Sequence, residues 1–237
     1  VYTILDSVQL PWGRDTQGED DKNKRTLPPM TEVYDITVDI VRSLKTKEAV
    51  QKAVTEYIYS CGKYVYNGAT SLIINDRTNT GDVINTEAFM EVLKTPQEET
   101  NYVNCADCAV LVQTISNIYG CNTCALYLGE NFKVNKALFI GESEERYPNK
   151  PGRDFDFHML VTHEIFKTPE ESNLCYDACI KYHGNVTGEL EQAIAQPFRL
   201  PAGAVPAGND TYLESICADI QNPPRNIKPI ILYFYVM

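Results

Sequence analysis

Cys105 carries the strongest signal for chemistry in this chain, because it directly follows a helix-capping residue. Asn104 is a good N-cap, and Asp107, three residues later, is an acid in the first helical turn. Residues 108–112 are all apolar, so we expect a helix buried on most of its circumference. Cys105 then occupies the first helical position, where unpaired N–H groups and the positive end of the dipole favour a thiolate. Nucleophilic cysteine catalysis requires this arrangement; the alternative is a small buried hydrophobe.

A nucleophilic thiol also needs a base beside it and a third group that orients the base. The chain contains 3 histidines, and His158 lies in the predicted strand 155–161, where we expect it on a sheet surface beside a helix. Asp177, in the next predicted strand (174–180), has apolar neighbours and needs a partner, which an imidazole N–H supplies. The residues therefore predict a Cys105, His158 and Asp177 triad. The alternatives are a structural histidine and a turn or capping carboxylate.

Two CxxC pairs, Cys105 with Cys108 and Cys121 with Cys124, indicate a zinc site when considered alone. If 106–119 is one helix, its rise of about 1.5 Å per residue places the pairs about 20 Å apart. The four sulfurs of a zinc site each lie about 2.3 Å from one metal. We therefore expect no metal and no other cofactor. Disulfides are expected instead among some of Cys61, Cys108, Cys121, Cys124, Cys175, Cys179 and Cys217.

Composition and charge exclude several classes of protein. The 237 residues are 43% hydrophobic, enough for a substantial core, and the formal net charge of -11 argues against a nucleic-acid partner. No run of about 18 apolar residues occurs, so no membrane span is expected. The chain begins at Val1, has an even count of 8 cysteines and carries glycosylation sequons at 185–187 and 209–211. These features predict a trimmed, extracellular glycoprotein, secreted with some disulfides.

Hydrophobic periodicity gives the order of the elements. Expected helices are 47–61, 86–93 and 105–120, with a short one at 190–194; expected strands are 32–40, 63–66, 123–128, 137–140, 155–161, 174–180 and 229–236. The last of these is a continuous apolar run, typical of a central strand buried on both faces. Residues 75–82 have turn composition. No linker is long enough to force two domains, so we expect a single domain over 1–237.

This order of parts resembles the transglutaminase-like superfamily, a branch of the papain-like cysteine enzymes. The family's cysteine motif has the nucleophile, an acid two residues on, an alanine, a run of aliphatic residues and a closing glycine before a strand. Residues 105–112 and 119–123 match that motif piece by piece. Residues 157–161 are similar to the family's histidine strand, and 176–178 to its aspartate strand. The resemblance covers about 47–182, leaving an N-terminal arm (1–30) and a C-terminal extension (183–237).

The resemblance implies an α+β, transglutaminase-like or papain-like fold, in which a buried helix bearing the cysteine packs on an antiparallel sheet. Cys105 would be the nucleophile, His158 the general base and Asp177 the orienting group. The implied function is a cysteine-nucleophile hydrolase or acyltransferase acting on amide bonds of a protein or peptide: a protease, an amidase or a transglutaminase-like enzyme. Hydrolysis is favoured over transfer, because no residues mark an amine site. The N–H of Cys105 would form half of an oxyanion hole.

Two features depart from the family's pattern. A tryptophan usually stands close behind the histidine, where this chain has Met159 and Leu160. Any of Tyr64, Tyr66 and Tyr102 could donate the side-chain hydrogen bond that completes the oxyanion hole. The single tryptophan, Trp12, could do so only if the N-terminal arm folds back. The competing class is a non-catalytic, secreted, disulfide-stabilised binding or toxin-like protein with the same fold.

Overall fold

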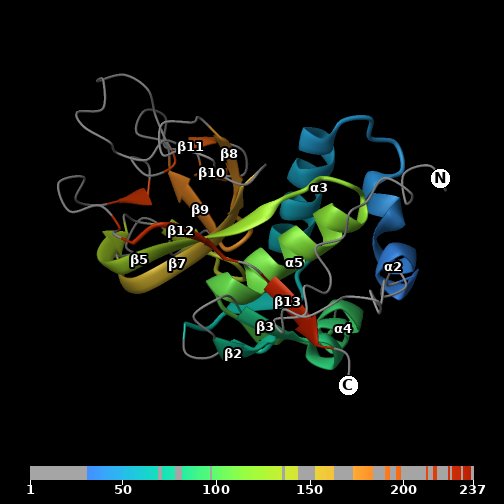
Figure 1. Ribbon diagram of the computed structural model, residues 1–237, viewed down its shortest axis with the longest axis horizontal. Coiled ribbons are helices and arrows are strands. Elements are labelled where there is room, and N and C mark those ends of the chain that lie inside the picture. The colour runs from blue at the N-terminus through green and yellow to red at the C-terminus, as the bar shows by residue number, and fades with distance from the viewer. Residues whose placement is uncertain are drawn as a thin grey trace, which may run out of the picture.

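The computed structural model describes 31–68, 71–77, 82–96, 98–134, 137–143, 153–162, 173–183, 190–192, 196–198, 212, 216–217, 224, 226–230 and 232–235. The expected N-terminal arm with Trp12 and both sequons lie outside the described residues. Figure 1 shows helices on one side of the molecule and a sheet on the other, with α5 between them.

The described helices are α2 (Thr31–Val41), α3 (Lys47–Ser60), α4 (Thr86–Lys94) and α5 (Cys105–Ile118). The described strands are β1 (Tyr64–Tyr66), β2 (Ile74–Arg77), β3 (Asp82–Asn85), β4 (Asn101–Val103), β5 (Cys124–Val134), β6 (Ala137–Phe139), β7 (Arg153–Thr162), β8 (Asn173–Tyr176), β9 (Ile180–His183), β10 (Leu190–Gln192), β11 (Gln196–Phe198), β12 (Lys228–Ile230) and β13 (Leu232–Tyr235).

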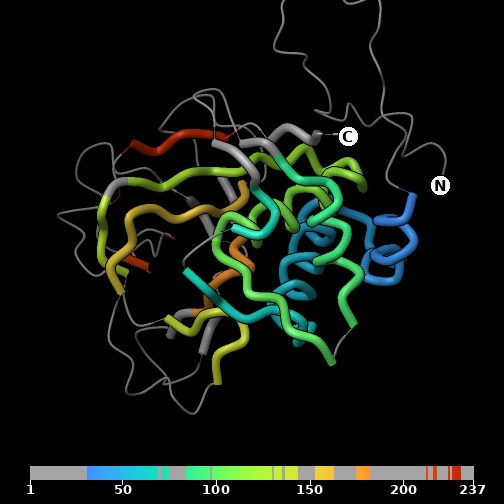
Figure 2. The backbone as a smooth tube through the Cα atoms, turned by 90° about the horizontal axis from the view of Figure 1, so that it is seen from below, coloured from blue at the N-terminus to red at the C-terminus, as the bar shows by residue number. Residues whose placement is uncertain are grey.

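Helix α5 is the core of the fold, because every one of its residues is buried. It packs against α2 and α3 on one side and against β7 on the other, as the two views in Figures 1 and 2 show. Its apolar sequence requires this position, since a helix that is apolar all round is stable in water only when it is enclosed. The prediction of a buried helix beginning at Cys105 is confirmed.

The sheet that faces α5 has the strand order β11-β8-β7-β5-β12, and all its neighbours are antiparallel. Strand β7 lies at its centre, and His158 pairs in register with Leu128 of β5. The other described strands form smaller sheets with the strand orders β10-β9-β6, β13-β3-β2 and β1-β4. The prediction of a mixed α+β chain with antiparallel sheets is thus confirmed.

Residues 32–40, expected to form a strand, belong to helix α2. Val33, Thr37 and Val41 are its buried residues, and this spacing of four defines one helical face. The hydroxyl of Thr37 donates to the carbonyl of Val33, 2.6 Å away, within the same face. The sequence matches both periods over this short span, and packing against α3 and α5 selects the helix.

The prediction of one central strand over 229–236 is also wrong, because this apolar segment is divided between β12 and β13. Each is an edge strand, β12 beside β5 and β13 beside β3. Pro229 has no backbone N–H to donate, which suits an edge rather than the middle of a sheet. Two further predictions are corrected: 75–77, expected as turn, lie in β2, and 190–192, expected as helix, form β10.

Candidate active site

Cys105 lies at the start of α5 because a complete capping box forms around it. The side-chain oxygen of Asn104 accepts hydrogen bonds from the N–H groups of Ala106 (2.9 Å) and Asp107 (3.1 Å). The Asp107 carboxylate accepts one in return from the N–H of Asn104 (3.0 Å). The cap therefore fixes the first turn and leaves the N–H of Cys105 outside its own hydrogen bonds.

Asp107 does more than cap the helix. Its carboxylate is fully buried and also accepts hydrogen bonds from the Ser71 hydroxyl (2.5 Å) and from the N–H groups of Leu72 (3.2 Å) and Ile73 (2.9 Å). A buried carboxylate is stable when several donors satisfy it in this way. The charge thus ties the segment 71–73 to the helix terminus that carries Cys105.

His158 and Asp177 form a hydrogen-bonded pair, with Nε2 2.8 Å from Oδ2 and both side chains 1% exposed. A carboxylate can only accept, so the imidazole carries a proton on Nε2 and donates it to Asp177. The other ring nitrogen, Nδ1, has no hydrogen-bond partner among the described residues. When the imidazole is neutral, the pair thus selects the tautomer that leaves Nδ1 available to a thiol.

The thiol of Cys105 lies beside this imidazole. Burial lowers the pKa of His158, but the charge and hydrogen bond of Asp177, and then the adjacent Cys105, outweigh burial and raise the pKa to about 10. No geometrically complete hydrogen bond joins Nδ1 to the thiol, which is common for catalytic pairs without substrate. The structure therefore brings together all three residues predicted as a triad.

Asp177 differs in one respect from the expectation. It was expected inside a strand over 174–180, but it lies in the bend between β8 and β9. Its Oδ1 accepts the N–H of Cys179, two residues later, at 2.8 Å. This local turn is typical of aspartate, and it leaves Oδ2 directed at His158 of β7.

Tyr212 is a member of the site that the sequence gave no reason to choose. It is fully buried, and its hydroxyl donates a short hydrogen bond to Oδ2 of Asp177, the oxygen that also accepts from His158. The chain has 15 tyrosines, and Tyr212 follows a stretch of prolines and glycines without periodicity. No local pattern could have identified it.

Of the three tyrosines left open as oxyanion donors, Tyr66 is the one near the thiol. The hydroxyl of Tyr64 donates to the carbonyl of Val92 at 3.5 Å, so it is directed toward α4. Tyr102 is 58% exposed. The pKa of Tyr66 is raised by burial and then by Cys179 and Cys105, while Arg153 opposes the rise.

An aromatic wall continues from Tyr66 to the histidine. The ring centroids of Tyr66 and Phe139 are 4.5 Å apart, those of Phe139 and Phe155 5.7 Å, and Phe155 meets His158 edge-on at 5.5 Å. The guanidinium of Arg153 lies 4.5 Å from the centroid of Phe139. Such a wall lowers the local dielectric constant and strengthens the charge interactions of His158.

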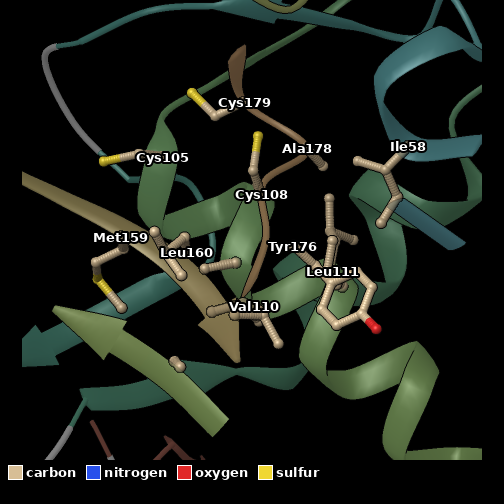
Figure 3. Packing of buried hydrophobic residues seen from close by; sticks show 14 of the residues in the cluster. Ile58, Cys105, Cys108, Val110, Leu111, Met159, Leu160, Tyr176, Ala178 and Cys179 are labelled. Atoms are coloured by element: carbon tan, nitrogen blue, oxygen red, sulfur yellow. The ribbon is translucent and has the colours of Figure 1, made fainter. Parts of the chain in front are cut away.

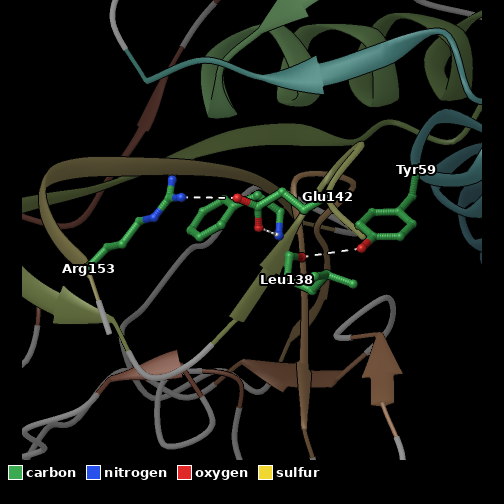
Figure 4. Close-up of polar contacts among 5 residues, drawn as sticks. Tyr59, Leu138, Glu142 and Arg153 are labelled. Atoms are coloured by element: carbon green, nitrogen blue, oxygen red, sulfur yellow. Dashed lines mark hydrogen bonds and ion pairs between the residues drawn. The ribbon is translucent and has the colours of Figure 1, made fainter. Parts of the chain in front are cut away.

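The guanidinium that covers this wall is held in place by a carboxylate (Figure 4). Glu142 accepts from Arg153 at 3.0 Å through Oε1 and from the N–H of Phe139 at 2.8 Å through Oε2. On the residue before Phe139, the carbonyl of Leu138 accepts from the hydroxyl of Tyr59 at 3.3 Å. The carboxylate of Glu142 therefore balances the positive charge of Arg153 beside the site.

Besides Cys105, all the cysteines except the half-buried Cys61 are buried. All eight are in the thiol form, so the expected disulfides are not present in the structure. Cys108 lies one turn deeper in α5 and contacts Cys179, as the core view in Figure 3 shows. Cys121 and Cys124 lie beyond the far end of the unbroken helix, where their thiols face the carbonyls of Lys47 and Ala125. Among the described residues, no three His, Cys, Asp or Glu side chains are grouped as metal ligands.

No protein-family model, no curated protein and no solved structure matches this chain. Within the described ranges, no helix has the length and apolar character needed to cross a membrane. The geometry of Cys105, His158 and Asp177 is therefore the basis for a function.

Proposed function

We propose that this protein is a cysteine-nucleophile hydrolase or acyltransferase that acts on amide bonds of a protein or peptide, with hydrolysis as the favoured outcome. One observation carries the proposal: a fully buried imidazole donates to Asp177 through Nε2 and has its other nitrogen beside the thiol of Cys105. A nucleophile, a base and an orienting carboxylate in this order are what acyl transfer through a thiol needs.

The reactive form of the site has lost one proton, and its population grows as the pH rises toward the His158 pKa of about 10. In this form Nδ1 of His158 takes the thiol proton as Sγ of Cys105 attacks the carbonyl carbon. The developing oxyanion accepts hydrogen bonds from the N–H of Cys105, which the helix cap does not use, and from the hydroxyl of Tyr66. The imidazolium then gives its proton to the leaving amine, and a thioester remains on Cys105. Water, deprotonated by His158, attacks the thioester and releases the acid and the thiol.

We also propose that the fold is transglutaminase-like. The support is a buried helix that begins with the cysteine and packs on the strand carrying the histidine, with the aspartate after the next strand. The extracellular location stays a prediction, because its sequons lie outside the described residues.

Site-resolved alkylation with iodoacetamide at neutral pH tests the proposed base. Cys61 is an internal reference: it is half-buried, and burial raises the pKa of its thiol. We expect Cys105 to react faster than Cys61 in the wild type and at least about tenfold slower in His158→Ala. Peptide mapping by mass spectrometry reports both rates in one sample.

Equal rates at Cys105 in the wild type and in His158→Ala would exclude the base assignment. The protein would then belong to the competing class, a non-catalytic binding protein with this fold. Unfolding curves of both proteins provide the control, because a loosened core would speed the labelling of all buried cysteines together.

A further inference from the structure

We infer that Tyr212 is a positioning residue of the triad: its buried hydroxyl donates to the same carboxylate oxygen of Asp177 that accepts the proton of His158. This inference depends on the proposed function, since it assigns a role at the same site. Tyr212 lies 35 residues after Asp177 and outside the segment that resembles the family. The C-terminal part of the chain therefore completes the site.

The carboxylate of Asp177 is held by donors from three separate parts of the chain. Oδ1 accepts from the N–H of Cys179 at 2.8 Å, and Oδ2 accepts from His158 at 2.8 Å and from Tyr212. Rotation of the carboxylate plane away from this orientation would weaken all three bonds at once. The donors thus fix the direction in which Oδ2 faces the imidazole.

Burial of a tyrosine does not by itself require this contact, as Tyr176 demonstrates. Tyr176 is 1% exposed and adjacent to Asp177 in sequence, but its hydroxyl has no hydrogen-bond partner among the described residues. In Figure 3 its hydroxyl is directed away from Cys105 and Cys179. The bond from Tyr212 to Asp177 is therefore a specific arrangement rather than a consequence of filling the core.

The contact changes the charge that His158 experiences. A hydroxyl that donates to Oδ2 shares the negative charge of the carboxylate and weakens its hold on the imidazolium. An imidazolium held less tightly gives its proton more readily to a leaving amine. In Tyr212→Phe the ring still fills the core, but Oδ2 of Asp177 keeps only the hydrogen bond from His158.

The test is the pH dependence of alkylation at Cys105 by iodoacetate. This anionic reagent reacts faster while the adjacent imidazolium is charged, so its rate falls at the pH where His158 loses its proton. We expect Tyr212→Phe to move that fall upward by about 0.5–1 pH unit. The matched control Tyr176→Phe removes the buried hydroxyl of the residue that precedes Asp177 and should not move this fall in rate.

A double variant separates positioning from packing. If Tyr212 acts through the carboxylate, Tyr212→Phe has no effect on the profile in an Asp177→Asn background. A Tyr212→Phe profile that superimposes on the wild type, or an equal shift in both backgrounds, would overturn the inference. If instead the proposed function is wrong, the wild-type rate of alkylation at Cys105 does not depend on His158 at all, so the two failures can be distinguished.

A second measurement applies even if Tyr212→Phe does not fold. In the wild type, the hydroxyl proton of Tyr212 should give a downfield, slowly exchanging proton resonance, because it is buried and bonded to a carboxylate. The resonance should disappear in Asp177→Asn and persist in Tyr176→Phe. A wild-type spectrum without it would contradict the inference.

Discussion

The substitution Asp177→Asn tests the buried pair through the pH dependence of folding stability. In the folded protein the pKa of His158 is about 10, compared with 6.5 for an ordinary histidine. Between these two pH values the folded state binds one proton more than the unfolded state. The stabilisation is therefore fully present below pH 6.5 and is lost as the pH rises toward about 10.

The expected slope follows from proton linkage. One extra bound proton lowers the free energy of unfolding by about 1.4 kcal/mol for each pH unit, or about 2.7 kcal/mol between about pH 7 and about pH 9. In Asp177→Asn the neutral amide gives no such stabilisation, and burial lowers the pKa of His158. This part of the slope then disappears. Below about pH 6.5 the variant loses stability instead, because only its unfolded state is protonated.

The assay is urea unfolding of the wild type and Asp177→Asn at pH 7, 8 and 9, which lie between the unfolded-state and folded-state pKa values of His158. Buried cysteines and tyrosines also lower stability at the upper end. Those whose pKa Asp177 does not affect, such as Cys121 and Cys217, contribute equally to both proteins and cancel in the difference. His158→Gln should lose the same part of the slope. Wild-type and variant stabilities that change in parallel from pH 7 to pH 9 would refute the argument for a charged pair.

Two further predictions concern the frame of the site. Gly141→Ala should lower the free energy of unfolding by at least about 2–3 kcal/mol, because φ is +78° and a Cβ would lie 2.5 Å from the carbonyl of Tyr64. Gly62→Ala, at the same φ with nothing within 4 Å, should cost only about 1 kcal/mol. Asp107→Asn should cost about 3 kcal/mol, since four donors depend on its charge, while the exposed Asp39→Asn should change stability by less than about 0.5 kcal/mol. Urea unfolding at neutral pH measures all four; equal effects within either pair would contradict these assignments.

The parts of the site that the sequence predicted are those fixed by local chemistry. The start of α5 could be predicted because Asn104 and Asp107 cap it within one turn. His158 and Asp177 could be chosen because a buried histidine and a buried carboxylate each require a partner. The choice between Nε2 and Nδ1 depends on where β7, β8 and α5 meet, which no local pattern contains.

The parts that could not be predicted depend on contacts between distant segments. The stretch 32–40 satisfies both the helical and the strand period, and packing on α3 and α5 decides between them. The run 229–236 is uniformly apolar, so its division between two sheet edges is not visible in its composition. Tyr212 reaches Asp177 only through the tertiary fold, and nothing distinguishes it from the other tyrosines in sequence.

The most direct test of the central claim is to trap the acyl group on Cys105. A small activated ester such as p-nitrophenyl acetate gives a thioester on the nucleophile and releases nitrophenolate. We predict an acetyl group on the Cys105 peptide at short times, lost again by hydrolysis, and absent in His158→Ala. Acetylation confined to Cys61 and lysines, with Cys105 unmodified, would contradict the proposed function.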